Sequence, residues 1–391
     1  MKEVVIVSAV RTPIGSYLGS LSSLKGPELG AIVIKEAIKR ANIKPEDVSE
    51  VIMGCVLPAG MGQAPARQAS IFAGLPDSVP CLTINKVCGS GLKAVMLGDQ
   101  AIKCGDAEIV VAGGFESMSN VPYYLDKARV GYKMGNGTII DGMVHDGLWD
   151  VYNNFHMGSA AEMCSREMNI TREDQDAFAE ESYKRTLKAI EEGAFKEEIV
   201  PVEIKGKMDT RIVSEDDEPK KVNFEKGKTL KGAFQKDGTV TAFNSSSLND
   251  GAAALVLMSA EKARELGIKP LAKIVAQGSF AQKPEWFTTA PAYAIKNALA
   301  KAKLEVKDLD IVEANEAFAV QACAVNQLAE LDPSKVNVNG GAIALGHPIG
   351  GSGARILTTL LYAMKNRNSK RGLATLCIGG GEASALIVER I

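Results

Sequence analysis

The segment CLTINKVCGSGLKAV, residues 81–95, runs from an apolar stretch through a glycine turn into apolar residues at helical spacing. The segment VNVNGGAIALGHPIGGSGARI, residues 336–356, has the same order of strand, glycine-rich turn, GSG and helix. Cys88 lies in the turn of the first segment and His347 in the turn of the second. Two such segments indicate an internal repeat, which would place the thiol and the imidazole at equivalent positions of two halves.

Four further pairs of segments support the repeat and occur in the same order in both halves. The pairs are EVVIVSA (3–9) with LAKIVAQ (271–277), SEVIMGCV (49–56) with LDIVEANEA (309–317), EIVVAGGFES (108–117) with LATLCIGGGEAS (373–384), and GAAALVLM (251–258) with EASALIVE (382–389). Each half therefore predicts the order β-α-β-α-β-β. Continuously apolar strands such as IVVA and ALVLM indicate a sheet that is covered on both faces. The sequence thus predicts an α/β fold of two similar halves.

The last strand of the first half is delayed by a long insert. We place the first half at residues 1–118 plus 248–268, the insert at 119–247 and the second half at 269–391. The insert carries one clear helix, which begins at Thr171 with a capping signal to Asp174. Inserts at the loop end of a repeated layer commonly build substrate-binding lids, and this is the role we expect here.

The composition excludes several classes of protein. Of the 391 residues 46% are hydrophobic and 24% charged, and the net charge is −2, so nothing favours nucleic acid or a membrane surface as partner. The seven cysteines are an odd number without a C-x-x-C pair, which favours neither a disulfide framework nor a zinc site. We expect a reducing, cytoplasmic location and no metal.

Four polar or sulfur side chains stand at equivalent ends of the predicted strands. Cys88 precedes a helix, whose positive N-terminus favours a thiolate, although a buried structural cysteine is the alternative. Cys377 ends the fourth strand of the second half, just before Gly379, and Asn315 ends its second strand. If the halves pack about a pseudo-two-fold axis, these residues and His347 meet in one cleft. A thiol beside an imidazole makes a sulfur nucleophile, and glycine N–H groups can hold an oxyanion.

The motifs VCGSGLKAV, NEAFA, GGAIALGHPIGGSGAR and CIGGG together resemble the thiolases, in particular the biosynthetic acetyl-CoA acetyltransferases. QAPARQAS (63–70), FHMGSAAE (155–162) and TAFNSSSLNDGAA (241–253) extend the resemblance over the whole chain. It implies a layered α-β-α-β-α core with an inserted loop domain, homotetramers built as dimers of dimers, and a place in fatty acid metabolism. The implied reaction is the Claisen condensation of two acetyl-CoA molecules, or thiolysis in reverse, with coenzyme A as substrate and product and no further cofactor.

The resemblance also implies a role for each catalytic residue. Cys88 would carry the acyl group as a thioester, His347 would draw off its proton, and Cys377 would remove the α-proton of the second acyl-CoA. Backbone N–H groups of Cys88 and Gly379 would hold one oxyanion. The second oxyanion, that of the enolate, would be held by His347 and, through a water, by Asn315.

The insert would bind coenzyme A in such a protein. The residues implied for the pantetheine channel are Leu148, His156, Met157, Ser246 and Phe318, with Lys220 or Lys221 near the adenine phosphates. Three positions depart from the family pattern: Phe287 replaces a methionine, Phe243 a glycine and Glu382 a glutamine or methionine. The first two border the acyl and pantetheine channel in relatives. We expect the two rings to narrow the acyl pocket, unless Phe243 packs in the core beneath its loop.

Alternative functions remain at this point. A degradative thiolase for longer 3-oxoacyl-CoA chains shares the motifs, and a redox switch through a Cys88–Cys377 disulfide is compatible with neighbouring thiols. Ketosynthases use a histidine or asparagine where this chain has Cys377 followed by glycines, which argues against them. A non-catalytic CoA-binding protein would have no use for the complete set of catalytic residues.

Overall fold

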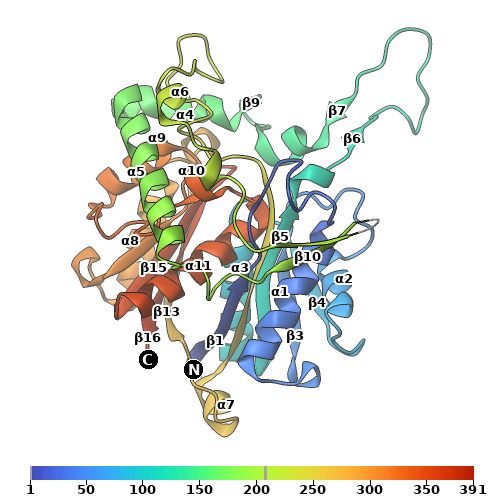
Figure 1. Ribbon diagram of the computed structural model, residues 1–391, viewed down its shortest axis with the longest axis vertical. Helices are drawn as coiled ribbons and strands as arrows, with labels where there is room; N and C mark the ends of the chain where they lie inside the picture. Colours follow the sequence, from blue (N-terminus) through green and yellow to red (C-terminus); the bar gives the residue numbers. More distant parts are fainter. Residues whose placement is uncertain (1, 207–208) are drawn as a thin grey trace.

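The centre of the molecule is a sheet of ten strands (Figure 1). The computed structural model describes residues 2–206 and 209–391. In spatial order the strands are β14 (Ile311–Ala314), β15 (Arg371–Ile378), β16 (Glu382–Arg390), β13 (Ala272–Ala281), β1 (Val4–Arg11), β12 (Asn249–Ser259), β5 (Ile109–Ser117), β3 (Glu50–Gly54) and β4 (Cys81–Ile84), and β2 (Gly15–Ser16) pairs with β12.

The strand order is symmetric about its centre. The strands β1 and β13 pair antiparallel there. Outward from β1 follow β12 and β5, both antiparallel to their inner neighbour, and then β3, which is parallel to β5. Outward from β13, the strands β16, β15 and β14 repeat these senses. The spatial pairs are those of the sequence repeat, so the two similar halves are confirmed.

One expected strand is missing from the second half. The counterpart of β4 is reduced to a single bridge between Val336 and Val312. The side chain of Asn337 takes over its pairing: the amide accepts from the N–H of Ala314 at 2.8 Å and donates to the carbonyl of Ala314 at 2.7 Å. Asn337 itself has φ +47°, outside strand geometry, so the ladder cannot continue.

The helices form three layers around the sheet. They are α1 (Gly26–Ala41), α2 (Pro65–Phe72), α3 (Ser90–Cys104), α7 (Ala260–Glu265), α8 (Ala290–Ala302), α9 (Ala319–Leu328), α10 (Ala342–Leu345) and α11 (Ile349–Asn366). Helices α3 and α11 pack on each other between the halves, while α1 covers one outer face and α8 the other. Alternate residues of β5 face different layers: Val111 joins the cluster under α1 and Val110 the central one. The layered α-β-α-β-α core is confirmed.

The two central helices touch through glycine. A Cβ atom at Gly91 would lie 2.8 Å from the backbone nitrogen of Ala354, and one at Gly353 would lie 2.3 Å from that of Leu92. Both distances are shorter than Cβ contacts in proteins, so only glycine allows the first turns of α3 and α11 to cross at this separation. The GSG of each repeat therefore serves helix packing.

The insert holds short strands and two long helices. Its elements are β6 (Tyr123–Tyr124), β7 (Ile140–Asp141), β8 (Trp149–Asp150), β9 (Phe155–His156), α4 (Met157–Met168), α5 (Arg172–Glu191), β10 (Val202–Lys205), β11 (Thr210–Val213) and α6 (Phe224–Lys228). The expected cap of α5 is present, with reciprocal hydrogen bonds between Thr171 and Asp174. Helix α4 was not expected. It begins where the His156 ring accepts the N–H of Gly158, a cap that the usual Ser, Thr, Asp and Asn signals do not include.

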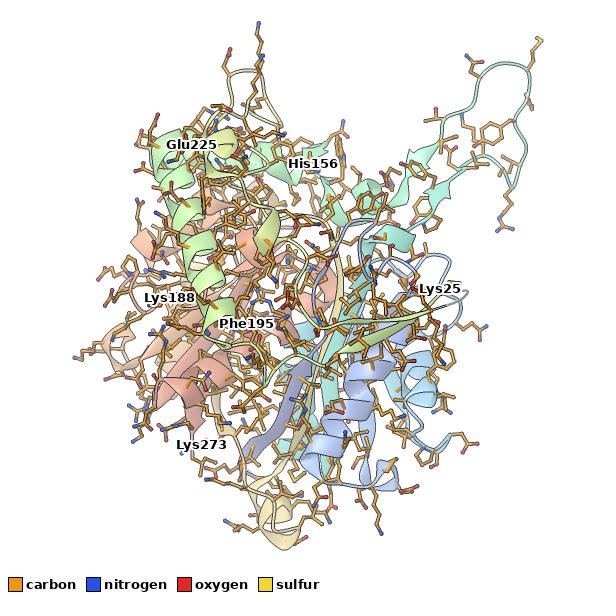
Figure 2. The ribbon with its side chains drawn as sticks, viewed as in Figure 1. Lys25, His156, Lys188, Phe195, Glu225 and Lys273 are labelled. Atoms are coloured by element: carbon orange, nitrogen blue, oxygen red, sulfur yellow. The ribbon has the colours of Figure 1, made fainter. Side chains whose placement is uncertain are left out.

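A buried charge cluster ties the insert to the first strand. The Arg11 guanidinium at the end of β1 donates to both carboxylate oxygens of Asp216, at 2.7 and 3.0 Å, and to Glu198 at 2.5 Å. All three side chains are almost fully buried. The Phe195 ring, labelled in Figure 2, is buried, and its centroid lies 5.2 Å from the guanidinium carbon. Removing Arg11 would leave two buried carboxylates without a partner, and removing either carboxylate would leave Arg11 with one partner in place of two.

We expect Asp216→Asn to lower the free energy of unfolding by about 3–5 kcal/mol, because the buried Arg11 guanidinium loses its two-oxygen partner and keeps only Glu198. Urea denaturation followed by circular dichroism measures this. Glu305→Gln is the matched control, because Glu305 pairs with Lys307 on the exposed surface and should leave the transition unchanged. Equal stability of Asp216→Asn and the parent would contradict the structural role of the cluster.

Candidate active site

Cys88 lies at the tip of the turn between β4 and α3. The preceding residue, Val87, has φ +44°, a conformation that a β-branched side chain rarely adopts. Such strain persists only where the surroundings impose it, and it is typical of functional turns. The turn directs Cys88 into a cavity of about 330 Å³ whose walls come from both halves and from the insert.

The cavity collects most of the residues that the sequence singled out. It is lined by Cys88, Leu148, His156, Met157, Ser246, Phe318, His347, Cys377 and Gly379. Asn315 lies behind this surface and contacts the ring of His347. The packing of the two repeats thus brings the four catalytic candidates together, as the pseudo-two-fold argument expects. Lys220 does not line the cavity: it is exposed and its ammonium pairs with Glu215.

The hydrogen bonds of His347 define its tautomer. Its Nδ1 lies 2.6 Å from the hydroxyl oxygen of Ser352, and that hydroxyl donates to the carbonyl of Pro348 at 2.9 Å. Because the hydroxyl proton is used, Nδ1 must be the donor and carry the ring proton. The lone pair is then on Nε2, which faces the amide nitrogen of Asn315 at 3.5 Å. His347 is therefore arranged to accept a proton at Nε2.

Burial decides the charge state of this site. It raises the pKa of Cys88 to about 11, although the backbone N–H groups of Gly379 and Cys88 oppose the rise. Burial, followed by repulsion from Cys88, raises the pKa of Cys377 well above its usual value. Burial and the charge of Arg355 lower the pKa of His347 to about 3. The sequence predicts that the helix N-terminus favours a thiolate at Cys88, but desolvation outweighs this effect in the resting site.

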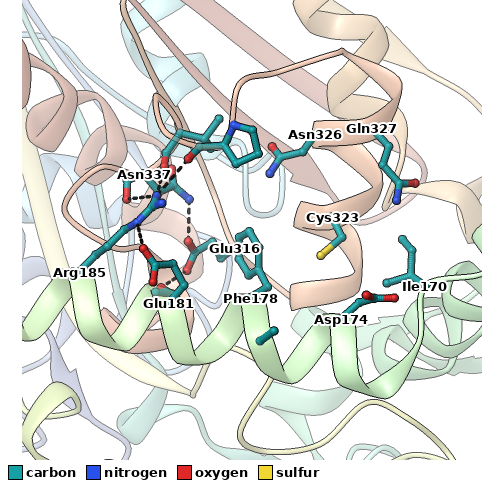
Figure 3. A pocket seen from close by; sticks show the side chains of 14 residues that line it. Ile170, Asp174, Phe178, Glu181, Arg185, Glu316, Cys323, Asn326, Gln327 and Asn337 are labelled. Atoms are coloured by element: carbon teal, nitrogen blue, oxygen red, sulfur yellow. Dashed lines mark hydrogen bonds and ion pairs between the residues drawn. The ribbon is translucent and has the colours of Figure 1, made fainter.

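Asn315 is held by a network that reaches a second cavity. The neighbouring Glu316 carboxylate accepts from Ser182 on α5 and from Asn337, each at 2.7 Å. It lines a cavity of about 380 Å³ between α5 and α9, where Figure 3 shows its bond to Asn337. Among the predicted site residues none lines this second cavity. The insert helix α5 thus supports the turn that carries Asn315.

The His156 side chain faces the cavity with a defined donor. Its Nδ1 accepts the N–H of Gly158 at 3.0 Å, so the neutral ring carries its proton on Nε2. Burial lowers the pKa of His156, which favours this neutral form. The ring stacks on Phe234, with 4.8 Å between the centroids, and Phe234 lines the cavity as well. This wall offers apolar surface and one N–H donor to a ligand.

Two thiolase family models match the chain. The thiolase N-terminal domain covers residues 4–261 and the thiolase C-terminal domain covers residues 268–390. The chain belongs to the thiolase family.

Named thiolase relatives match the chain from end to end. An acetyl-CoA acetyltransferase of Cupriavidus necator is 56% identical and one of Schizosaccharomyces pombe 54%, with all of this chain and 99% or more of each relative covered. The crystal structure of the Bacillus anthracis acetyl-CoA acetyltransferase superposes with a TM-score of 0.98 at 44% identity. The match covers all of this thiolase and 99% of the chain in the crystal structure.

The three departures of this thiolase have different environments. Phe287 lines the cavity, as expected. Phe243 does not: its ring stacks on Tyr183, with centroids 5.8 Å apart, and packs in the core beneath the loop. The expectation that both rings narrow the pocket is thus wrong for Phe243. Glu382 pairs with Lys86, two residues before Cys88.

Sequence reasoning missed two residues that hold His347. Ser352 fixes the tautomer, and the Asn249 side chain accepts the backbone N–H of His347 at 2.8 Å. Both lie inside the motifs GHPIGGSGAR and TAFNSSSLNDGAA, but their partners are set by tertiary contacts. A signal existed only for Ser352, because a hydroxyl five residues after a histidine can meet it in the first turn of a helix.

The described residues contain no group of three or more His, Cys, Asp or Glu side chains placed to hold a metal ion. In residues 2–206 and 209–391 no helix has the length and apolarity needed to span a bilayer.

Proposed function

We propose that this thiolase is an acetyl-CoA acetyltransferase. It condenses two acetyl-CoA molecules to acetoacetyl-CoA and coenzyme A, and it catalyses thiolysis in the reverse direction. The observation that carries the proposal is the meeting of Cys88, His347, Cys377 and Gly379 in one apolar cavity. The names of full-length relatives above 50% identity support the choice of acetyl groups. Coenzyme A acts as substrate and product, and the reaction requires no other cofactor.

The first half-reaction transfers the acetyl group to Cys88. The lone pair on Nε2 of His347 takes the thiol proton as the sulfur attacks the thioester carbonyl. The N–H groups of Cys88 and Gly379 stabilise the oxyanion that forms. When the carbon–sulfur bond of acetyl-CoA breaks, the leaving thiolate takes the proton of Cys377. The products are acetyl-Cys88, an imidazolium, a Cys377 thiolate and free coenzyme A.

The second half-reaction forms the carbon–carbon bond. The Cys377 thiolate removes an α-proton from the second acetyl-CoA, and the enolate attacks the acetyl-Cys88 carbonyl. Asn315 and the His347 imidazolium stabilise the enolate oxygen. Cys88 leaves as a thiolate and regains its proton from His347, which restores the resting state. The high pKa of Cys377 suits this role, because its thiolate is a strong base.

The division of labour between the cysteines can be tested by mass spectrometry. Incubation with acetyl-CoA should add one acetyl group per chain, on the peptide that carries Cys88. Cys377→Ser should still acquire the label but lose condensation by about 10²-fold or more, because the α-proton has no base. Cys88→Ser should lose both. Label on another residue, or acylation equally poor in both variants, would contradict the assigned roles.

The acyl pocket favours short chains because Phe287 forms part of its wall. We expect kcat/KM in thiolysis to fall steeply from C4 to C8 3-oxoacyl-CoA. Phe287→Ala should raise the C8-to-C4 ratio of kcat/KM at least tenfold, because one methylene alone changes binding by about 1–3 kcal/mol. Phe243→Ala should leave the ratio unchanged and cost about 3–5 kcal/mol of stability as a core truncation. A parent that processes C8 as well as C4 would favour the degradative alternative.

The proposal also covers the cellular location of the enzyme, its metabolic role and the binding of coenzyme A. The cysteines of the described chain are all free thiols, which supports a reducing, cytoplasmic location. A reaction that joins or splits two-carbon acyl groups supports a place in fatty acid metabolism. The site binds acyl-CoA molecules, and the pantetheine arm lies along the wall formed by His156, Met157 and Phe234. Lys220 keeps its proposed place near the adenine phosphates only if it leaves Glu215.

The same proposal includes a homotetramer, built as a dimer of dimers. The loop between β6 and β7 projects far from the body (Figure 1). It exposes large apolar side chains, among them Leu125, Val130, Met134 and Ile139, which is unusual for a loop in water. The outer strand β4 offers a second contact surface, because it is the free edge of the sheet and exposes Leu82.

We expect the double variant Val130→Glu, Met134→Glu to shift the molar mass in light scattering from tetramer to dimer. The added charges would be buried without partners in the contact between dimers. Ile212→Glu is the matched control, because Ile212 is similarly exposed on β11, outside the loop, and should leave the mass unchanged. A tetramer that persists in the double variant would contradict the role of the loop.

A further inference from the structure

Glu116 is a buried carboxyl group that the reaction above does not use. It lies near the end of β5 and is fully inaccessible to solvent. It does not line the catalytic cavity. A charged side chain in such a place is rare unless its oxygens are fully hydrogen-bonded, so the reason for its presence must be sought in its contacts.

Three backbone N–H groups donate to this carboxylate. Those of Val56 and Leu57, in the loop after β3, lie 3.0 and 3.1 Å from its oxygens, and that of Gly350, in the first turn of α11, lies at 2.9 Å. The thiol of Cys55 is a fourth contact at 3.6 Å. Four donors to two oxygens require an acceptor on every side, which only the ionised carboxylate supplies. A glutamine side chain would point its own NH₂ group at one of these donors, and the two groups would repel each other.

The donors connect the two halves of the active site. On one side, the Asn85 side chain donates to the carbonyl of Val56 and accepts the N–H of Val87, the residue before the nucleophile. On the other side, Gly350 follows His347 by three residues. A chain of hydrogen bonds therefore runs from the nucleophile turn through Glu116 to the loop of the base.

The packing around this junction leaves no room for adjustment. A Cβ atom at Gly350 would lie 2.6 Å from a carboxylate oxygen of Glu116, and one at Gly114 would lie 2.1 Å from the carbonyl oxygen of Gly350. The first turn of α11 thus rests directly on the backbone of β5. In a close-packed contact of this kind, a change at Glu116 must displace one of the two catalytic segments.

We propose that Glu116 is a positioning residue, whose ionised carboxylate holds the Cys88 turn and the His347 loop in register across the junction of the two halves. The inference rests on the proposed function for the roles of Cys88 and His347. It adds a residue that does not line the catalytic cavity, and through it the first half contacts the first turn of the helix that follows His347.

The negative charge of Glu116 has a measurable effect on Cys88 that a purely structural residue would not have. Its negative charge raises the pKa of Cys88, in addition to the larger effect of burial. Burial also raises the pKa of Glu116 itself to about 7, against the pull of its three N–H donors. Other titratable or charged side chains stand on the segments that meet it. They are Cys55 after β3, Cys88 before α3, Asp250 on β12, and His347 and Arg355 on the α11 side.

The test combines the rate of Cys88 acylation by acetyl-CoA with the pH dependence of Cys88 alkylation by iodoacetamide. Glu116→Gln should slow acylation at least tenfold, with less than a threefold change in KM. It should also move the alkylation midpoint to lower pH, because a nearby negative charge is removed. Glu116→Asp, which keeps the charge but retracts it, should slow acylation without the downward shift. Gly350→Ala should slow acylation with Glu116 intact.

Glu162→Gln is the matched control. Glu162 is also buried and accepts two backbone N–H groups, of Thr239 and Val240, inside the insert. We expect a loss of stability from it and an unchanged alkylation profile. Acylation within twofold of the parent in both Glu116→Gln and Gly350→Ala would overturn the proposal, as would a slow Glu116→Gln with an unshifted midpoint. Alkylation of Cys88 needs no acyl transfer, so failure of the proposed function would appear separately, as a parent that alkylates at Cys88 but never acquires acetyl label.

Discussion

The contact between the first turns of α3 and α11 is the constraint on which the rest of this structure depends. Gly91 and Gly353 let the two helices approach until backbone meets backbone, and each helix follows directly from the turn that carries Cys88 or His347. Any larger side chain at this crossing would separate the helices and, with them, Cys88 and His347. Helix N-termini that meet in this way also bring several backbone N–H groups to one place, which suits a site where oxyanions form.

The burial of the site explains why neither the sulfurs of Cys88 and Cys377 nor the imidazole of His347 is charged at rest. A cavity walled by two sheet halves and an apolar insert removes water from both thiols and from the ring. Burial then raises the pKa values of the cysteines and lowers that of His347. In the proposed reaction, proton transfer therefore accompanies bond formation.

Much of the fold follows from the internal repeat, because the strands and turns of each repeated segment are specified by the local sequence. Apolar strands, glycine turns and the Thr171 cap are local features, and apart from the counterpart of β4 they occur where the sequence indicates. The failures arise where a tertiary contact replaces a local one. The Asn337 amide takes the place of a strand beside Ala314, and the ring of His156 caps α4 in place of a hydroxyl or carboxylate. Neither contact follows from a periodic pattern in the sequence, so neither could be predicted from it.

The sequence by itself determined the two halves and the four side chains that the fold brings together at the cavity, because repeat order and motif spacing are properties of the chain. The tertiary structure alone decided the protonation of Cys88 and His347, since desolvation depends on what surrounds a group and not on its neighbours in sequence. It also decided that Phe243 turns into the core while Phe287 lines the cavity, because two similar rings are distinguished only by the space that packing leaves for each.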